Sequence, residues 1–82
     1  MSAETGVRAV VEVMARALTD RPDAVRVTES QHKQMTVIEL AVAPDDLGKV
    51  IGRQGRTAAA LRTLVSLAAE QVGTRAQLDI RD

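Results

Sequence analysis

One short segment limits what this chain can fold into. The run from Gly48 to Arg56 reads Gly-Lys-Val-Ile-Gly-Arg-Gln-Gly-Arg, and a long stretch rich in Ala and Leu follows it. Glycine permits sharp turns and close approach to the main chain. The run therefore predicts two consecutive helices joined by a tight loop, in which Gly52 and Gly55 flank a polar pair.

Positive charge gathers around this loop in a chain that is neutral overall. The 82 residues include 11 basic and 11 acidic side chains. No acidic residue occurs from Leu47 to Ala69, whereas four basic ones do: Lys49, Arg53, Arg56 and Arg62. Such a concentration of charge is typical of a small site for a phosphate backbone. Arg62 lies about two turns into the following helix, and we interpret it as general surface.

Length and composition exclude several classes of protein. A chain of 82 residues predicts a single domain, residues 1–82. There is no Cys, and the one histidine, His32, lies in a polar segment, so we expect no metal and no cofactor. There is no Phe, Tyr or Trp on which bases could stack, which excludes RRM, cold-shock and OB surfaces. No apolar stretch reaches the roughly 20 residues of a membrane span, so we expect a soluble cytoplasmic protein.

Apolar periodicity predicts an α+β fold. The expected order is helix, strand, strand, helix, helix, strand. The expected ranges are helices over 5–19, 44–51 and about 56–72, strands over 24–29, 35–42 and 76–81, and a polar turn over 30–34. Helices would cover one face of a three-stranded sheet. Two helices separate the second strand from the third, which leaves room for a crossover and so permits a mixed sheet.

The last helix carries more apolar residues than one small sheet can cover. Its wide apolar face is formed by Ala58, Leu61, Leu64, Val65, Ala68 and Val72. Leu67 lies about 100° from the centre of that face, beside Ala60. We expect Leu67, with Ala60 and Leu64, to contribute to a self-association or partner surface. The alternative is a one-sided core with a harmless marginal leucine, because single exposed leucines are common.

This pattern resembles a known family. The element order, with Val-Ile-Gly-Arg-Gln-Gly at 50–55 between two helices, resembles a K-homology (KH) domain of the bacterial type II arrangement. Residues 43–56, followed by Leu-Arg-Thr-Leu-Val at 61–65, look like the KhpA-type proteins, which are small bacterial RNA-binding proteins. The resemblance covers nearly the whole chain. It implies an αββααβ type II KH domain, in which three helices cover one face of a three-stranded mixed sheet. It also implies single-stranded RNA as ligand and a KhpB/Jag-like KH protein as partner.

The chemistry of the loop can be argued from its residues. A side chain at Gly52 or Gly55 would block a phosphate from the main chain. Free N–H groups at the start of the second helix would face that phosphate, and the helix dipole would favour it. Basic and amide side chains would add contacts, and an apolar step would offer a wall to about four unstacked nucleotides. The expected RNA-binding residues are Lys49, Val50, Ile51, Gly52, Arg53, Gln54, Gly55 and Arg56.

Each of these interpretations has an alternative. The two glycines could be only the cap and bend of a helix–turn–helix connection. A DNA-reading helix would need polar residues near its start, where residues 58–60 are all Ala. We expect at least one of Val50 and Ile51 to be mostly core. Asp45 and Asp46 are interpreted as complements to a helix dipole rather than as a catalytic pair.

Two functional hypotheses remain. The chain lacks a P-loop, a Gly-x-Gly-x-x-Gly motif, a Cys nucleophile and a second His, so we do not expect an enzyme. The first hypothesis is a non-enzymatic single-stranded RNA-binding protein that acts as a post-transcriptional regulator or RNA chaperone. The alternative is a protein-interaction adaptor that acts mainly through dimerisation, either with a second KH protein or as a homodimer.

Overall fold

The computed structural model describes residues 3–82, with side chains from Gly6 onward, so Met1 and Ser2 of the expected domain lie outside the described residues. The elements are α1 (Ala3–Leu18), β1 (Arg26–His32), β2 (Met35–Ala41), α2 (Leu47–Ile51), α3 (Arg56–Gln71) and β3 (Arg75–Arg81). Short 3-10 turns precede β1, α2 and α3, at Pro22–Ala24, Pro44–Asp46 and Arg53–Gly55. The predicted αββααβ order is confirmed. Within residues 3–82, no helix is long and apolar enough to cross a membrane.

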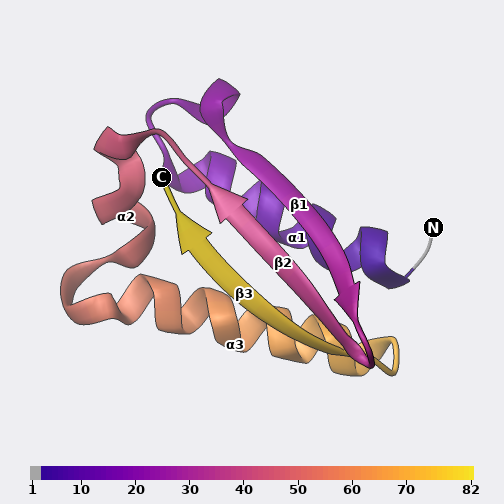
Figure 1. Cartoon of the computed structure of the whole chain (residues 1–82). Helices are drawn as coiled ribbons and strands as arrows, with labels where there is room; N and C mark the ends of the chain where they lie inside the picture. Colours follow the sequence, from indigo (N-terminus) through magenta and orange to yellow (C-terminus); the bar gives the residue numbers. More distant parts are fainter. Residues whose placement is uncertain (1–2) are drawn as a thin grey trace.

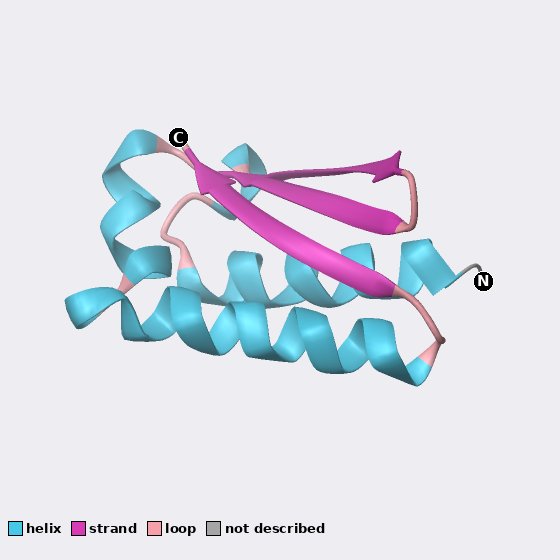
Figure 2. Cartoon of the chain, turned by 60° about the horizontal axis from the view of Figure 1, so that its bottom comes forward, coloured by secondary structure: helices cyan, strands magenta, loops and turns pink. Residues whose placement is uncertain are grey.

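The three strands form one mixed sheet in the order β1-β2-β3. β1 and β2 are antiparallel, with Arg26 opposite Ala41 and His32 opposite Met35. β2 and β3 are parallel, with Met35 beside Arg75. The long helices α1 and α3 lie side by side against one face of the sheet, and α2 lies at one end of this helical layer (Figures 1 and 2). The predicted α+β architecture is therefore confirmed.

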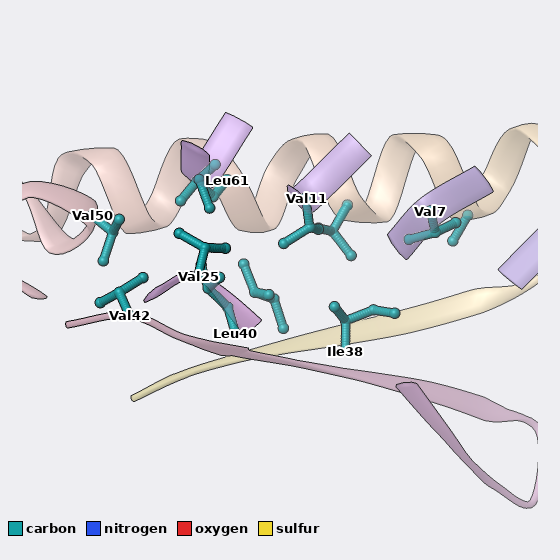
Figure 3. Close-up of a cluster of buried hydrophobic side chains, with 12 residues drawn as sticks. Val7, Val11, Val25, Ile38, Leu40, Val42, Val50 and Leu61 are labelled. Carbon is teal, nitrogen blue, oxygen red and sulfur yellow. The ribbon is translucent and has the colours of Figure 1, made fainter. Parts of the chain in front are cut away.

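An aliphatic core fills the space between the sheet and the helices. On β2, Thr36, Ile38 and Leu40 are buried, at the alternating spacing of residues that share one face of a strand. Figure 3 shows Ile38 and Leu40 against side chains from the helical layer. The labelled residues are Val7, Val11, Val25, Ile38, Leu40, Val42, Val50 and Leu61. Because Val50 of α2 belongs to this core, the core also fixes the helix that enters the glycine loop.

The structure corrects the first strand of the prediction. β1 begins at Arg26 rather than Ala24, because Pro22–Ala24 forms a 3-10 turn. It also continues through the polar residues 30–32, which were expected to form a turn, and places His32 in a strand. These residues pair with β2 along a continuous register, and the hairpin turn is confined to Lys33 and Gln34. Polar composition suggested a loop, whereas cross-strand pairing makes the segment a strand.

The buried face of α3 also differs from the prediction. Ala58, Leu61, Val65 and Ala69 are buried, whereas Leu64 and Val72 are 41% and 46% exposed. Leu64 lies about 100° from Val65 around the helix, which puts it on a flank. Val72 follows the last residue of α3. The expected interface residues Ala60, Leu64 and Leu67 are all exposed.

Candidate functional site

The glycine loop joins α2 to α3 through an unusual backbone. The N–H of Gly52 donates to the carbonyl of Gly48 at 2.9 Å and ends α2. Three residues then have positive φ: Gly52 at 78°, Gln54 at 58° and Gly55 at 73°. Left-handed backbone is rare for a residue with a side chain, and it is enriched at ligand-binding sites. The predicted tight connection between two helices is confirmed, with Gln54 as its strained point.

The two glycines of the loop have different environments. A Cβ at Gly52 would lie 2.2 Å from Oγ1 and 2.9 Å from N of Thr57. A Cβ at Gly55 would meet nothing within 4 Å. Gly52 is therefore required by the packing of the protein itself. Only at Gly55 is the space beside the main chain open to another molecule.

The backbone donors of the loop are partly used within it. The N–H of Gly55 donates to Gly52 at 3.1 Å, and the N–H of Arg56 donates to the carbonyl of Arg53. Arg53 and Gln54 begin the 3-10 turn, and the first N–H groups of a helical turn have no partner within it. The donors suited to an anion therefore lie at Arg53 and Gln54, one turn earlier than the sequence suggested.

Three polar side chains of the loop are exposed. They are Arg53, Gln54 and Arg56, and Arg56 Nη2 donates to Gln54 Oε1 at 3.3 Å. Among the side chains that the structure describes, neither arginine forms an ion pair. Within two residues of the open main chain of Gly55, the sequence therefore carries two cations that no described carboxylate neutralises.

Lys49 differs from these two arginines, because it already has anionic partners. Its Nζ binds the carboxylate of Asp20 and lies 3.6 Å from Oδ1 of Asp46. The hydrogen bond that Lys49 donates to Asp20 is the main reason that the pKa of Lys49 rises above 10.5. Lys49 thus ties α2 to the segment that follows α1.

Asp46 is the anchor of this connection. Its side chain is only 1% exposed, and its two oxygens accept hydrogen bonds from the backbone N–H groups of Asp20 at 3.1 Å and Arg21 at 3.0 Å. Burial raises the pKa of Asp46, but these two bonds and Lys49 outweigh it, so the net pKa lies below 3.8. Asp46 was expected to complement a helix dipole. In the structure, its carboxylate instead joins the start of α2 to the segment after α1 through hydrogen bonds. Sequence reasoning missed this role, because the partners lie 25 and 26 residues away.

The apolar pair before the loop divides between core and surface. Val50 is fully buried and has no surface to offer a ligand. Ile51 is half-buried at the end of α2. The expectation that at least one of them belongs to the core is confirmed, and only Ile51 can form an apolar wall beside the loop.

Arg62 links α3 to the sheet. Its Nε donates to the carbonyl of Leu78 on β3 at 3.4 Å. The residue is exposed, as expected for general surface, but its head group lies on the flank of α3 that faces β3. The contact of Arg62 therefore shows which flank of α3 faces β3. We do not count Arg62 among the cations of the loop.

The candidate site is not a pocket. A hollow of about 310 Å³ lies near the opposite end of α3, lined by Met35, Ser66, Glu70, Thr74, Arg75 and Ala76. No residue of the glycine loop lines it. The loop instead offers an exposed edge of main chain with basic side chains beside it.

Comparison with known proteins gives a consistent result. The family model described as KhpA/KhpB, KH domain, matches residues 8–80. The RNA-binding protein KhpA of Halalkalibacterium halodurans is 53% identical, over 92% of this chain and 99% of that relative. The RNA-binding protein KhpA of Caldanaerobacter subterraneus is 52% identical, over 87% of this chain and 95% of the relative.

A solved structure shares the fold. It is the crystal structure of Era in complex with MgGDPNP and nucleotides 1506–1542 of 16S ribosomal RNA. The similarity has a TM-score of 0.65 at 20% identity and covers 92% of this chain. It covers 29% of the Era chain, so this chain spans less than a third of that protein. At this identity, the similarity concerns the fold alone.

Proposed function

The chain belongs to the KhpA/KhpB family of KH domains, and on that premise we propose that it is a non-enzymatic protein that binds single-stranded RNA at the Gly52–Gly55 loop. Arg53 and Arg56 neutralise phosphate, and the N–H groups of Arg53 and Gln54 donate to it. Ile51 offers an apolar wall to an unstacked base. A single clamp of this kind holds about four nucleotides. The cellular role that fits is post-transcriptional regulation or RNA chaperoning in the bacterial cytoplasm.

The observation that carries this proposal is the open main chain at Gly55, close in sequence to two arginines that form no ion pair with any described side chain. A phosphate needs both a donor and room to approach it. The side of Gly55 that a Cβ would occupy is empty. The relatives named RNA-binding protein KhpA support the choice of RNA over another anion.

The experiment replaces the polar pair of the loop. We expect Arg53→Asp together with Gln54→Asp to abolish binding of a fluorescent single-stranded RNA, because the new carboxylates repel the phosphate. Both positions are exposed, so each change should alter the free energy of unfolding by no more than about 0.5 kcal/mol. Fluorescence anisotropy measures binding, and urea denaturation measures stability.

A matched control keeps the charge change but moves it away from the loop. Arg75→Asp with Gln77→Asp alters two exposed residues of β3. This control should retain most of the binding. Wild-type affinity in the Arg53/Gln54 variant would exclude the loop as the RNA site.

A second candidate function is that of an adaptor that dimerises, and one surface favours it. Val10 and Val13 of α1 are 38% and 69% exposed, and Leu64 and Leu67 of α3 are 41% and 51% exposed. We name these four residues, together with Ala60, the helical seam. Four large apolar side chains on two adjacent helices are more than the scattered exposed residues of an ordinary surface.

Two contacts place these residues along the line where α1 meets α3. Arg8 Nε lies 3.6 Å from Oε1 of Glu29, so the Arg8 flank of α1 faces β1. Val10 is about 160° around α1 from Arg8, so it lies on the flank away from β1. The Nε of Arg62 donates to Leu78 of β3. Leu64 is about 160° around α3 from Arg62, so it lies on the flank away from β3. α1 packs against α3, and the two run in opposite directions (Figure 1). The valines and leucines therefore share the outer side of the helical layer.

Sedimentation across a concentration series tests this candidate. We expect wild-type protein to form homodimers or to bind a KhpB/Jag-like KH protein, and Val13→Gln with Leu67→Gln to remain monomeric. The matched control is Val37→Gln on the open face of the sheet. A monomer at all concentrations, without a complex on addition of the KH partner, would leave a solitary RNA-binding module.

A further inference from the structure

We propose that Asp20 is a built-in competitor of RNA, because its carboxylate holds the ammonium group of Lys49 in an intramolecular ion pair beside the glycine loop. This inference rests on the proposed function and concerns a residue outside the loop. It assigns Lys49 to a tether within the free protein rather than to the set of cations that bind phosphate. Removal of the Asp20 carboxylate should therefore strengthen RNA binding.

The position of Lys49 makes it a potential phosphate ligand. It lies three residues before Gly52 on α2, so it is about one helical turn from the loop. Its side chain is 45% exposed, so its ammonium group can be reached from solvent. In sequence it is one of three basic residues around the loop, and nothing in the sequence distinguishes it from Arg53 or Arg56.

The contacts of Lys49 make it unlike those arginines. Its Nζ faces two carboxylates, those of Asp20 and Asp46. One ammonium between two carboxylates leaves the cluster with one net negative charge. An incoming phosphate therefore meets no free cation at this position and has to displace Asp20 to reach Lys49.

Asp20 is dispensable for the fold in a way that Asp46 is not. Asp46 is buried and binds two backbone N–H groups, one of which belongs to residue 20. That N–H remains when the side chain of residue 20 changes. The Asp20 side chain itself is 77% exposed, and its described polar contact is with Lys49. An exposed ion pair contributes little to stability, so the main effect of the Asp20 carboxylate is on the charge available at Lys49.

The test compares Asp20→Asn with wild type on a short single-stranded RNA of mixed sequence. We expect about two- to fivefold tighter binding, a change in affinity that matches the free energy of one exposed ion pair. The slope of log K against log salt should steepen by up to about 0.7, the contribution of one further phosphate contact on a single strand. The thermal midpoint should stay close to that of wild type.

The matched control is Asp45→Asn. It removes the same charge from a neighbouring exposed carboxylate, which lies 3.9 Å from Arg21 and forms no ion pair with Lys49 within the described residues. We expect a smaller change in affinity and an unchanged slope. In a Lys49→Met background, Asp20→Asn should have no more effect than Asp45→Asn, because the proposed route runs through Lys49.

Two results would overturn this proposal alone, and two others bear on the proposed function. One is an Asp20→Asn variant that binds RNA no more tightly than Asp45→Asn. Another is an equal gain in the Lys49→Met background, which would show a general loss of negative charge instead of a released lysine. Wild-type protein without RNA affinity would overturn this inference and the proposed function together. RNA binding that survives Arg53→Asp with Gln54→Asp would overturn the loop assignment alone, since the Asp20 comparison would still report on Lys49.

Discussion

The two halves of the segment from Asp46 to Arg56 have opposite surroundings. In the first half, Asp46 and Val50 are buried and Lys49 is ion-paired. Gly52, at the end of that half, is packed against Thr57. In the second half, the side chains of Arg53, Gln54 and Arg56 are exposed, and Gly55 has open space beside it.

This difference separates support from recognition. The first half fixes the direction in which the chain leaves α2, and the second half presents donors and charge at that fixed point. A loop that is ordered before it binds loses less conformational entropy on binding than a flexible one. A short basic glycine motif can therefore contain as much scaffold as binding surface.

Substitution of each glycine by alanine is the strongest test of this division between support and recognition. We expect Gly52→Ala to destabilise the protein by about 2–4 kcal/mol, from left-handed backbone strain together with overlap with Thr57. Gly55→Ala has room and should cost only the left-handed strain, about 1–2 kcal/mol. Urea denaturation of both variants measures the difference. Equal losses of stability would show that the two glycines do the same work.

The apolar pair gives the next largest effect. Val50→Ala removes fully buried carbon and should cost about 1.5–3 kcal/mol, whereas Ile51→Ala, which is half-buried, should cost about 1 kcal/mol. RNA affinity of the folded protein should fall only for Ile51→Ala. Denaturation combined with anisotropy under native conditions checks both statements. If fully folded Val50→Ala protein bound RNA more weakly than wild type, the assignment of the apolar wall to Ile51 alone would be wrong.

Much of the fold follows from local features of the sequence. The apolar alternation of β2 and β3 predicts both strands to within one residue, and the glycine run predicts the loop between α2 and α3. The helix before the loop begins at Leu47 rather than Pro44, because Pro44–Asp46 forms a 3-10 turn. The errors arise where a distant segment decides the structure. Ser30–His32 look like a turn until the register with β2 is known, and the burial of Leu64 depends on which flank of α3 faces the sheet.

The candidate site is less predictable than the fold for the same reason. The charge and the glycines of the loop are visible in the sequence, but their division of roles is not. The role of Gly52 depends on the placement of Thr57 after a left-handed turn. The role of Lys49 depends on Asp20, which lies 29 residues earlier. Neither contact has a local signal.

The stability of the protein should depend on pH through Asp46, the buried carboxylate of the first half. Because folding lowers the pKa of Asp46 below 3.8, its stabilising effect is fully present above pH 3.8 and is lost as the pH falls through the folded-state pKa. Asp46→Asn should lower the thermal midpoint at pH 7, and the gap from wild type should narrow in acid. Asp45→Asn, an exposed control, should show almost no gap. A gap that stays constant down to pH 2 would mean that Asp46 contributes through shape rather than charge.

The smallest effect in energy concerns the salt dependence of RNA binding, which counts the cations that the second half supplies. Each phosphate neutralised on a single strand contributes about −0.7 to the slope of log K against log salt. Arg53 and Arg56 alone therefore predict a slope near −1.4, and Arg53→Gln should reduce it to about −0.7. Stability should move by less than about 0.5 kcal/mol, because the side chain is exposed. A wild-type slope near −2 would mean that Lys49 leaves Asp20 to bind phosphate, and the first half of the segment would then also supply charge for recognition. A slope near −6 would require a much larger basic surface than this loop.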